Sequence, residues 1–284
     1  MSNPISWGDR NKPQIALTFD DGPYEEVTPK LLDVLRRHSV KATFFCIGQR
    51  VDRLPEIVKQ TYEEGHLIAN HSYDGNLHLR REDDNKVLKE LRDANAAIQK
   101  ATGYIPKYFR PPFGEPPFED NQSNDNVSRV TELAKTLGLV HIHWSLDTND
   151  WRSPGVDSIV KDLMSAQNGS IILCHDLPRE ANQTRGEDTI KAVDQAIPEL
   201  KKRGLSFVTI EELLSSMTQP PSERECPQGS IVYVVQSGDY LSKIAERFYG
   251  DGSEQSWRKI YEANKDLIGN PEQIEPGWKL CLPQ

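Results

Sequence analysis

The stretch QIALTFDDGP, residues 14–23, decides the fold class of this chain. An apolar run of strand-forming residues ends in two adjacent carboxylates, Asp20 and Asp21, and a Gly-Pro turn follows. Residues 28–38 then show helical apolar spacing, with Thr28 placed to cap the helix and Pro29 to occupy its first turn. A strand, a turn and a helix in this order form the repeating unit of α/β proteins.

The same unit recurs as far as about residue 214. Apolar runs predict strands at residues 41–48, 66–70, 139–146, 170–176 and 205–210, and helical patterns lie between them at 54–65, 83–103, 157–169 and 188–204. Strands and helices that alternate predict a parallel sheet covered by helices, most simply a barrel. In a barrel of this kind the chemistry lies at the C-terminal ends of the strands.

The composition narrows the classes of partner. The chain has 284 residues, of which 36% are hydrophobic, and its apolar runs are shorter than a membrane span requires. Its formal net charge is -9, from 34 basic and 43 acidic residues. That charge argues against a nucleic acid or an anionic membrane as the main partner and favours a neutral or cationic substrate.

A second unit is predicted after a linker. Residues 1–214 form the α/β domain, and residues 215–230 are rich in Pro, Ser, Gln and Glu without apolar periodicity, which is typical of a linker. Residues 231–284 then predict a strand, two helices and a closing strand, a small α+β domain.

The four cysteines fall into two kinds. Cys46 and Cys174 lie inside apolar runs and are expected to be buried free thiols. Cys226 and Cys281 bracket the small domain, which would suit a disulfide in an oxidising compartment, although spacing alone leaves the pairing open.

Ionisable side chains follow five of the segments that end at the expected barrel mouth. Each one taken alone has an ordinary explanation, such as a solvated turn or a hydrogen-bonded histidine. Five in one alternating region are harder to explain as coincidence, and we expect them to converge at one mouth. They are Asp20 and Asp21, His71, Arg110, Asp147 with Asp150, and His175 with Asp176.

These residues lie in motifs that resemble the NodB-type polysaccharide deacetylases, carbohydrate esterase family 4, over residues 12–214. The motifs are TFDDGP (18–23), HSYDG (71–75), RPPFG (110–114), DTNDW (147–151) and LCHD (173–176). The resemblance implies a distorted (β/α)7 barrel that removes acetyl groups from chitin, chitooligosaccharides, peptidoglycan or xylan with a divalent metal. The segments YVVQSGDYLSKIA (233–245) and WRKIYEAN (257–264) resemble a LysM module with βααβ order, which binds N-acetylglucosamine chains.

The resemblance assigns a metal and a base. It implies that Asp21 and His71 are metal ligands, with zinc as the metal, or cobalt or nickel. A divalent cation lowers the pKa of water. Asp20 matches the family's general base, and Arg110 matches the arginine that orients this base and keeps it ionised.

The remaining roles also come from the resemblance. The backbone N–H of Phe113 would stabilise the oxyanion, and His175 would protonate the leaving amine. Asp150 matches the carboxylate that orients this histidine, while Trp151 and Leu173 match residues that line the acetyl pocket.

One position departs from the family. The second metal-binding histidine of the family pattern is Gly75 here, and a catalytic zinc ordinarily has three protein ligands. Three explanations stay open: His78 is the third ligand from a shifted loop, Asp74 supplies an oxygen, or the site is weak or empty.

In the LysM-like segment the resemblance places sugar binding on two loops. The residues concerned are Gly238, Asp239, Tyr240 and Leu241, with the loop at 271–274 that includes Ile274. Tyr240 stands where threonine is usual, so it could stack on a sugar or cover the small core. Core positions are expected at Tyr233, Trp257, Ile260 and Leu280.

Three functions from different classes follow. The first is a metal-dependent deacetylase of N-acetylglucosamine polymers, chitin or chitooligosaccharides above all and peptidoglycan as the alternative, held on its substrate by the LysM module. The second is a glycan-binding protein whose metal site is incomplete at Gly75. The third is an amidohydrolase of small molecules, which the LysM module argues against. The first twenty residues lack a secretory signal, yet substrate and cysteines favour a secreted or cell-wall monomer with its leader absent.

Overall fold

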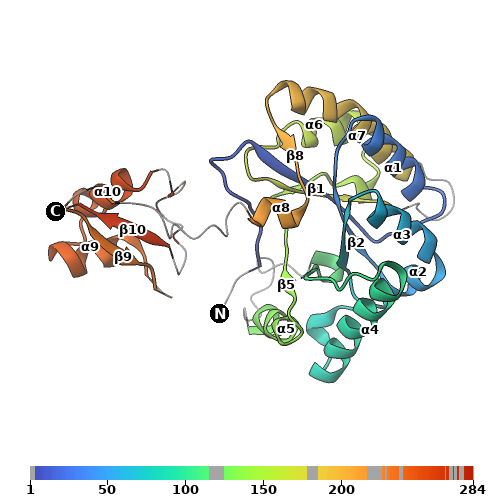
Figure 1. The fold of residues 1–284 in the computed structure, drawn as a ribbon, viewed down its shortest axis with the longest axis horizontal. Coiled ribbons are helices and arrows are strands. Elements are labelled where there is room, and N and C mark those ends of the chain that lie inside the picture. Colours follow the sequence, from blue (N-terminus) through green and yellow to red (C-terminus); the bar gives the residue numbers. More distant parts are fainter. Residues whose placement is uncertain are drawn as a thin grey trace. The chain divides into compact units, whose positions relative to one another are not determined.

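The computed structural model of the chain describes residues 4–114, 125–177, 185–215, 226–227, 229–236, 239–265, 267–268, 271, 274 and 278–283. The chain divides into two compact units, residues 1–214 and 215–284 (Figure 1). No helix within the described ranges is long and apolar enough to cross a membrane.

One parallel sheet forms the centre of the larger unit. Its strands are β1 (Gln14–Asp20), β2 (Thr43–Cys46), β3 (Leu67–Asn70), β4 (Tyr108–Phe109), β5 (Val140–His141), β6 (Leu146–Asp147), β7 (Ile171–His175) and β8 (Ser206–Phe207). Their order is β5-β4-β3-β2-β1-β7-β6, and β8 pairs with the start of β1. Asp20 lies opposite Phe45 of β2 and opposite His175 of β7, so neighbouring strands end at one level.

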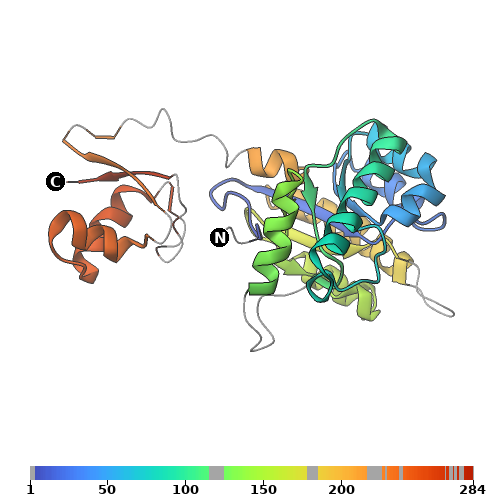
Figure 2. The same cartoon turned by 90° about the horizontal axis from the view of Figure 1, so that it is seen from below.

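Helices pack around this sheet. They are α1 (Thr28–Arg37), α2 (Gly48–Arg53), α3 (Pro55–Glu63), α4 (Asp84–Thr102), α5 (Asp125–Thr136), α6 (Val156–Leu163), α7 (Arg185–Lys202) and α8 (Ile210–Ser215). Helix α7 packs against α1 and α6, whereas α4 packs against α2, α3 and α5 (Figures 1 and 2). The prediction of an α/β fold of the distorted (β/α)7 barrel type is confirmed.

Two local predictions are wrong. The expected strand at 139–146 is two short strands, β5 and β6, at opposite ends of the sheet order. Between β5 and β6 the carbonyl groups of Ile142 and His143 accept hydrogen bonds from the Arg110 side chain. These backbone groups therefore do not pair with a neighbouring strand, and the strand is interrupted. Thr28 does not cap α1, because Val27 is the N-cap and the Thr28 hydroxyl bonds elsewhere.

The central strands are buried almost throughout. Strands β1 and β2 are covered on both faces, which explains why their sequences are apolar without alternation. The largest core cluster joins these strands to α1, α6 and α7. Cys46 and Cys174 are free and buried in the core, as expected.

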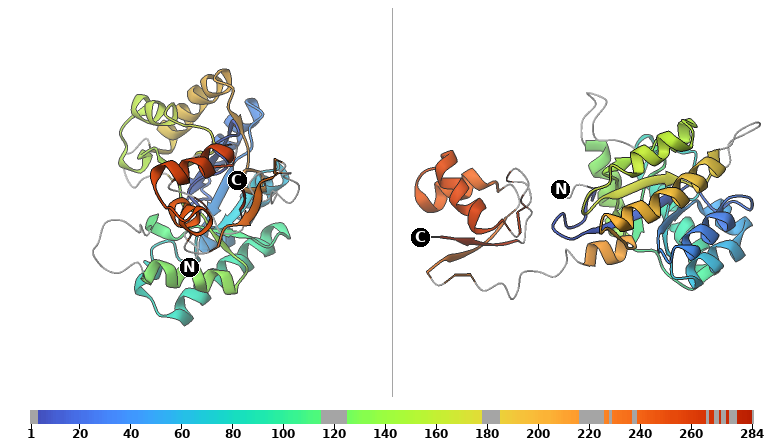
Figure 3. Two further views of the ribbon diagram at one scale, coloured as in Figure 1. Left: turned by 90° about the vertical axis from the view of Figure 1, so that its left-hand side faces the viewer. Right: turned by 90° about the horizontal axis from the view of Figure 1, so that it is seen from above.

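The smaller unit has the expected βααβ order. Strands β9 (Ile231–Val234) and β10 (Lys279–Leu282) pair antiparallel, and α9 (Leu241–Tyr249) and α10 (Glu254–Ala263) lie on one face of the pair (Figure 3). The predicted core positions are confirmed. Tyr233, Ile260 and Leu280 are buried, and the partly buried Trp257 packs against them.

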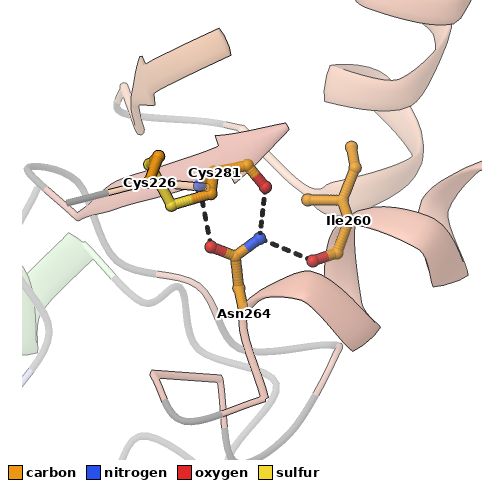
Figure 4. Close-up of a disulfide and its surroundings, with 4 residues drawn as sticks. All are labelled: Cys226, Ile260, Asn264 and Cys281. Atoms are coloured by element: carbon orange, nitrogen blue, oxygen red, sulfur yellow. Dashed lines mark hydrogen bonds between the residues drawn. A yellow bond between two sulfur atoms is a disulfide. The ribbon is translucent and has the colours of Figure 1, made fainter. Parts of the chain in front are cut away.

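A disulfide joins Cys226 to Cys281, which confirms the predicted pairing (Figure 4). Beside it the Asn264 side chain donates to the carbonyl oxygens of Ile260, at 2.6 Å, and Cys281, at 2.8 Å, and accepts from the Cys281 N–H at 2.8 Å. Asn264 therefore ties the end of α10 to β10, a role that the sequence did not reveal.

Candidate active site

The end of β1 presents the two carboxylates. Asp20 is the last residue of the strand and is buried, while Asp21 has a left-handed backbone, with φ 79°, and leads into a cis Gly22–Pro23 peptide. A Cβ on Gly22 would lie 2.2 Å from a carboxylate oxygen of Asp176, so a side chain at position 22 requires Asp176 to move.

Arg110 is fully buried beside Asp20. Its Nη1 donates to Asp20 Oδ1 at 2.6 Å and to the Thr18 hydroxyl at 2.9 Å. The Nε and Nη2 groups donate to the carbonyl oxygens of Ile142 and His143. A buried guanidinium is tolerated when its donors are satisfied and its charge is paired. The arrangement fixes the Asp20 carboxylate in an ion pair with the buried guanidinium.

His71 follows β3 and faces both carboxylates. Its Nδ1 lies 2.8 Å from the carbonyl oxygen of Arg110, a contact that places the ring proton on Nδ1. Its Nε2 lies 3.3 Å from Asp21 Oδ1 and 3.9 Å from Asp20 Oδ2. Burial would raise the pKa of Asp21, but the hydrogen bond and charge of His71, with the charges of His175 and Arg50, lower it.

Asp21 and His71 have the chemistry of two ligands of one divalent metal ion. A neutral imidazole nitrogen and a carboxylate oxygen are zinc ligands, and a ring N–H bonded to a backbone carbonyl is the usual support of a zinc-binding histidine. In the part of the chain that the structure describes, no three His, Cys, Asp or Glu side chains are grouped so that they could hold a metal. Among the described residues, Asp21 and His71 therefore have no third side chain placed to complete a metal site.

The loop after His71 explains this incompleteness. The side chain of Glu90, from α4, accepts the backbone N–H groups of Tyr73 at 3.1 Å and Asp74 at 2.7 Å, which fixes the loop. A Cβ on Gly75 would meet Ile47 Cδ1 at 2.1 Å. A side chain at position 75 therefore requires Ile47 to move.

His78, the other candidate ligand, packs on an aromatic ring. Its imidazole stacks on the Phe113 ring, with centroids 4.2 Å apart and planes inclined by 25°. Burial first, and then the charges of Arg81 and Arg80, lower its pKa. Both effects favour the neutral form of the imidazole that stacks on Phe113.

His175 is paired with a buried carboxylate. Its Nδ1 lies 2.8 Å from Asp150 Oδ1, and its backbone N–H donates to Asp150 Oδ2, which also accepts the Thr189 hydroxyl at 2.9 Å. Burial opposes charge on the imidazole, but the charge and hydrogen bond of Asp150, followed by the charges of Asp21 and Asp20, raise the pKa of His175 to about 10. The Asp150 carboxylate therefore favours the imidazolium form of His175.

The three expected substrate-contacting residues differ in exposure. Phe113 is 57% exposed and has a left-handed backbone, with φ 63°, a conformation that costs about 1–2 kcal/mol for an L residue. Trp151 is 40% exposed, with the Arg152 guanidinium over its ring, whereas Leu173 is buried within β7.

One contact near the mouth was not anticipated from the sequence, the hydrogen bond between Thr28 and Asp176. Thr28 donates to Asp176 Oδ2 at 2.6 Å and accepts the Tyr24 N–H at 2.8 Å, so this pair ties the turn after β1 to the end of β7. Burial raises the pKa of Asp176 to about 7. The sequence placed Asp176 at the mouth, directly after an apolar strand, but not its partner Thr28.

The described residues among those expected to bind sugar in the smaller unit differ in exposure. Tyr240 is 57% exposed, so it does not cover the core, while Leu241 is buried in it. Asp239 accepts hydrogen bonds from the Tyr233 hydroxyl and the Gln236 N–H. Ile274 packs against the core, and Gly238 lies outside the described residues.

Two protein families match the chain. The polysaccharide deacetylase family matches residues 8–139, and the LysM domain matches residues 233–283. A peptidoglycan-N-acetylglucosamine deacetylase of Bacillus cereus is 36% identical over 232 residues, which cover 78% of this chain and 78% of that protein. A chitooligosaccharide deacetylase of Bradyrhizobium sp. is 36% identical over 207 residues, 70% of this chain and 90% of that protein.

Solved structures agree with this assignment. The structure of a peptidoglycan N-acetylglucosamine deacetylase superposes with a TM-score of 0.64 at 36% identity, over 74% of this chain and 91% of that chain. A CE4 family pseudoenzyme from Bacillus anthracis superposes with a TM-score of 0.65 at 29% identity, over 75% of this chain and 70% of that chain. The chain therefore belongs to the polysaccharide deacetylase family, with a LysM domain at its C-terminal end.

Proposed function

We propose that the protein is a metal-dependent deacetylase of N-acetylglucosamine polymers. The observation that carries this proposal is the pair of matched acid and base groups on neighbouring strands. Asp20 accepts a hydrogen bond from Arg110 at the end of β1, and the His175 imidazole is hydrogen-bonded to Asp150 at the end of β7, directly opposite in register. Hydrolysis of an amide needs both groups.

In the proposed reaction Asp20 removes a proton from the attacking water, whose oxygen bonds to the acetyl carbon. The oxyanion accepts a hydrogen bond from the backbone N–H of Phe113. His175 then protonates the sugar nitrogen as the C–N bond breaks, releasing acetate and a free amine. Trp151 and Leu173 line the acetyl pocket.

Asp21 and His71 would hold the divalent ion, with zinc as the first choice and cobalt or nickel as alternatives. Such an ion supplies a Lewis acid that favours ionisation of water. Since His78 packs on Phe113 and the loop at Asp74 is fixed by Glu90, we propose that two side chains alone hold the ion. Zinc should then bind more weakly than at a three-ligand site.

The second unit directs the proposed activity to polymers. We propose that residues 231–284, joined through a linker at 215–230 to the catalytic residues 1–214, bind the same glycan and raise its concentration at the catalytic mouth. Relatives named for peptidoglycan and for chitooligosaccharides support either polymer, and chitin remains our first choice. The disulfide and the glycan substrate support a secreted or cell-wall location.

Acetate release tests the proposal. Metal-stripped protein with Zn2+, Co2+ or Ni2+ added back is incubated with an N-acetylglucosamine pentamer, colloidal chitin or peptidoglycan. The expected result is metal-dependent release that Asp20→Asn abolishes while the far-UV CD spectrum stays unchanged. Equal release by wild type and Asp20→Asn would refute the proposal.

One observation favours a second candidate, a glycan-binding protein without catalysis. The family position of the third ligand is Gly75, and the family includes a pseudoenzyme of similar fold. Binding of the pentamer by the full chain without acetate release under any of the three metals would establish this second function.

A further inference from the structure

The stacked contact of His78 with Phe113 joins two loops that lie far apart in the sequence. Phe113 has a left-handed backbone, and the next residue, Gly114, also has a positive φ, 67°. Two successive residues in this region make a tight turn that ordinary L residues avoid. The turn persists only if its surroundings fix it.

One side of the turn is closed by Trp144. A Cβ on Gly114 would lie 2.1 Å from the Trp144 ring, so the backbone touches the indole directly. The ring of Phe113 extends from the turn and is mostly exposed, and the aromatic ring stacked on it is His78. Removing the imidazole would leave the Phe113 ring free to change its position, and the strained backbone with it.

His78 itself is firmly placed. It immediately precedes the 3-10 helix Leu79–Arg81, and Leu79 is completely buried in a cluster with residues of α4 and α5. Arg129 of α5 donates to the carbonyl oxygens of Arg80, at 3.3 Å, and Glu82, at 2.7 Å. The imidazole therefore reaches Phe113 from a fixed support.

We propose that His78 is a positioning residue for deacetylation: its imidazole holds the Phe113 ring, and thereby keeps the Phe113 N–H aimed at the acetyl carbonyl. The inference rests on the proposed function, in which that N–H stabilises the oxyanion. It gives His78 a task other than metal binding. Because the oxyanion forms only in the transition state, the contact should affect kcat and not KM.

Two substitutions at this position separate the roles. His78→Ala removes the ring and should lower kcat about tenfold on the N-acetylglucosamine pentamer, with KM within about twofold of wild type. His78→Phe keeps a flat ring but has no metal-binding nitrogen, and should restore kcat to within about threefold of wild type. Zinc affinity, measured by calorimetry, should be the same in wild type and His78→Phe.

Three results would overturn the inference. A His78→Phe variant that is as slow as His78→Ala and binds zinc more weakly would make His78 a metal ligand. A His78→Ala variant with wild-type kcat would remove any role in positioning. Wild-type protein that releases no acetate would refute the proposed function and this inference together. The first two results leave the wild-type activity intact and refute the inference alone, so the two failures can be told apart.

The contact can be measured without substrate. In histidine-labelled protein, the ring-proton resonance of His78, identified by its absence from His78→Phe, should be shifted upfield by Phe113 and return toward the ordinary value in Phe113→Leu. A resonance that Phe113→Leu does not move would contradict the stacking on which the inference depends.

Discussion

Replacement of Asp150 by asparagine should move the alkaline limit of activity down by several pH units. Asp150 is 2% exposed and accepts three hydrogen bonds, two from His175 and one from Thr189. Its negative charge is the principal attraction that offsets burial and raises the pKa of His175 to about 10. Asparagine keeps the shape and removes the charge.

The size of the effect follows from the protonation of His175. With a pKa near 10, about 99% of the imidazole is protonated at pH 8. Burial, which lowers this pKa, remains when the Asp150 charge is removed; if the pKa of the variant falls to the ordinary value of about 6.5, only about 3% is protonated at pH 8. If His175 is the general acid, kcat/KM at pH 8 should fall about thirtyfold from protonation alone. Activity should be recovered as the pH falls: about 90% of an imidazole of ordinary pKa is protonated at pH 5.5, and burial shifts the recovery to lower pH than this.

The assay is acetate release from the soluble pentamer between pH 5 and 10.5. Thr189→Val is the matched control, because it removes one hydrogen bond to Asp150 but leaves its charge, so the alkaline limb should stay where it is. An Asp150→Asn profile whose alkaline limb coincides with that of wild type would refute the assignment of His175 as the acid controlled by Asp150.

Other substitutions test the remaining parts. Arg110→Met should lower the free energy of unfolding by about 3–5 kcal/mol, measured with urea, because it leaves Asp20 buried without its partner. The double variant Arg110→Met/Asp20→Asn should recover most of this loss. A double variant with no recovery would count against the pairing. Gly75→His combined with Ile47→Ala should bind zinc more tightly than Gly75→His alone, since the smaller side chain at 47 makes room, and equal affinities by calorimetry would contradict that steric argument. Tyr240→Ala should weaken retention on insoluble chitin about tenfold if the exposed ring stacks on a sugar. Turnover of the soluble pentamer is the control and should not change. Unchanged retention would show that Tyr240 is not part of the binding surface.

The sequence was sufficient to predict which strand ends meet. Parallel strands in register end at one level, so Asp20 and His175 could be expected at one mouth from the pattern of strands and helices alone. The buried core residues follow from apolar runs in the same way. The βααβ order of the small unit and its disulfide were also predicted, because strand, turn and helix signals are local and the cysteines bracket the domain.

Contacts between loops could not be predicted. Neither the stacking of His78 on Phe113 nor the hydrogen bond of Thr28 to Asp176 leaves a periodic pattern in the sequence, because each is a single side-chain contact between segments far apart in the chain. The expected strand at 139–146 failed for a related reason. The segment is apolar, but Arg110 donates hydrogen bonds to carbonyl groups in the middle of it, which interrupts the strand.

The conformation of the loop after His71 could not be predicted for the same reason. The departure at Gly75 was visible in the sequence, but its consequence was not, because the clamp by Glu90 and the approach of Ile47 depend on side chains from other elements. Such contacts decide whether a replacement ligand can reach the proposed metal site.

The most direct test of the central claim is a zinc titration of the metal-stripped protein, with acetate release from the pentamer measured at each step. We predict negligible release without metal and a rise that saturates at one ion per chain, with a weaker apparent affinity in Asp21→Asn. Release that persists in the stripped protein, or that stays absent at saturating zinc, would contradict the claim that Asp21 and His71 form the metal site of an active deacetylase.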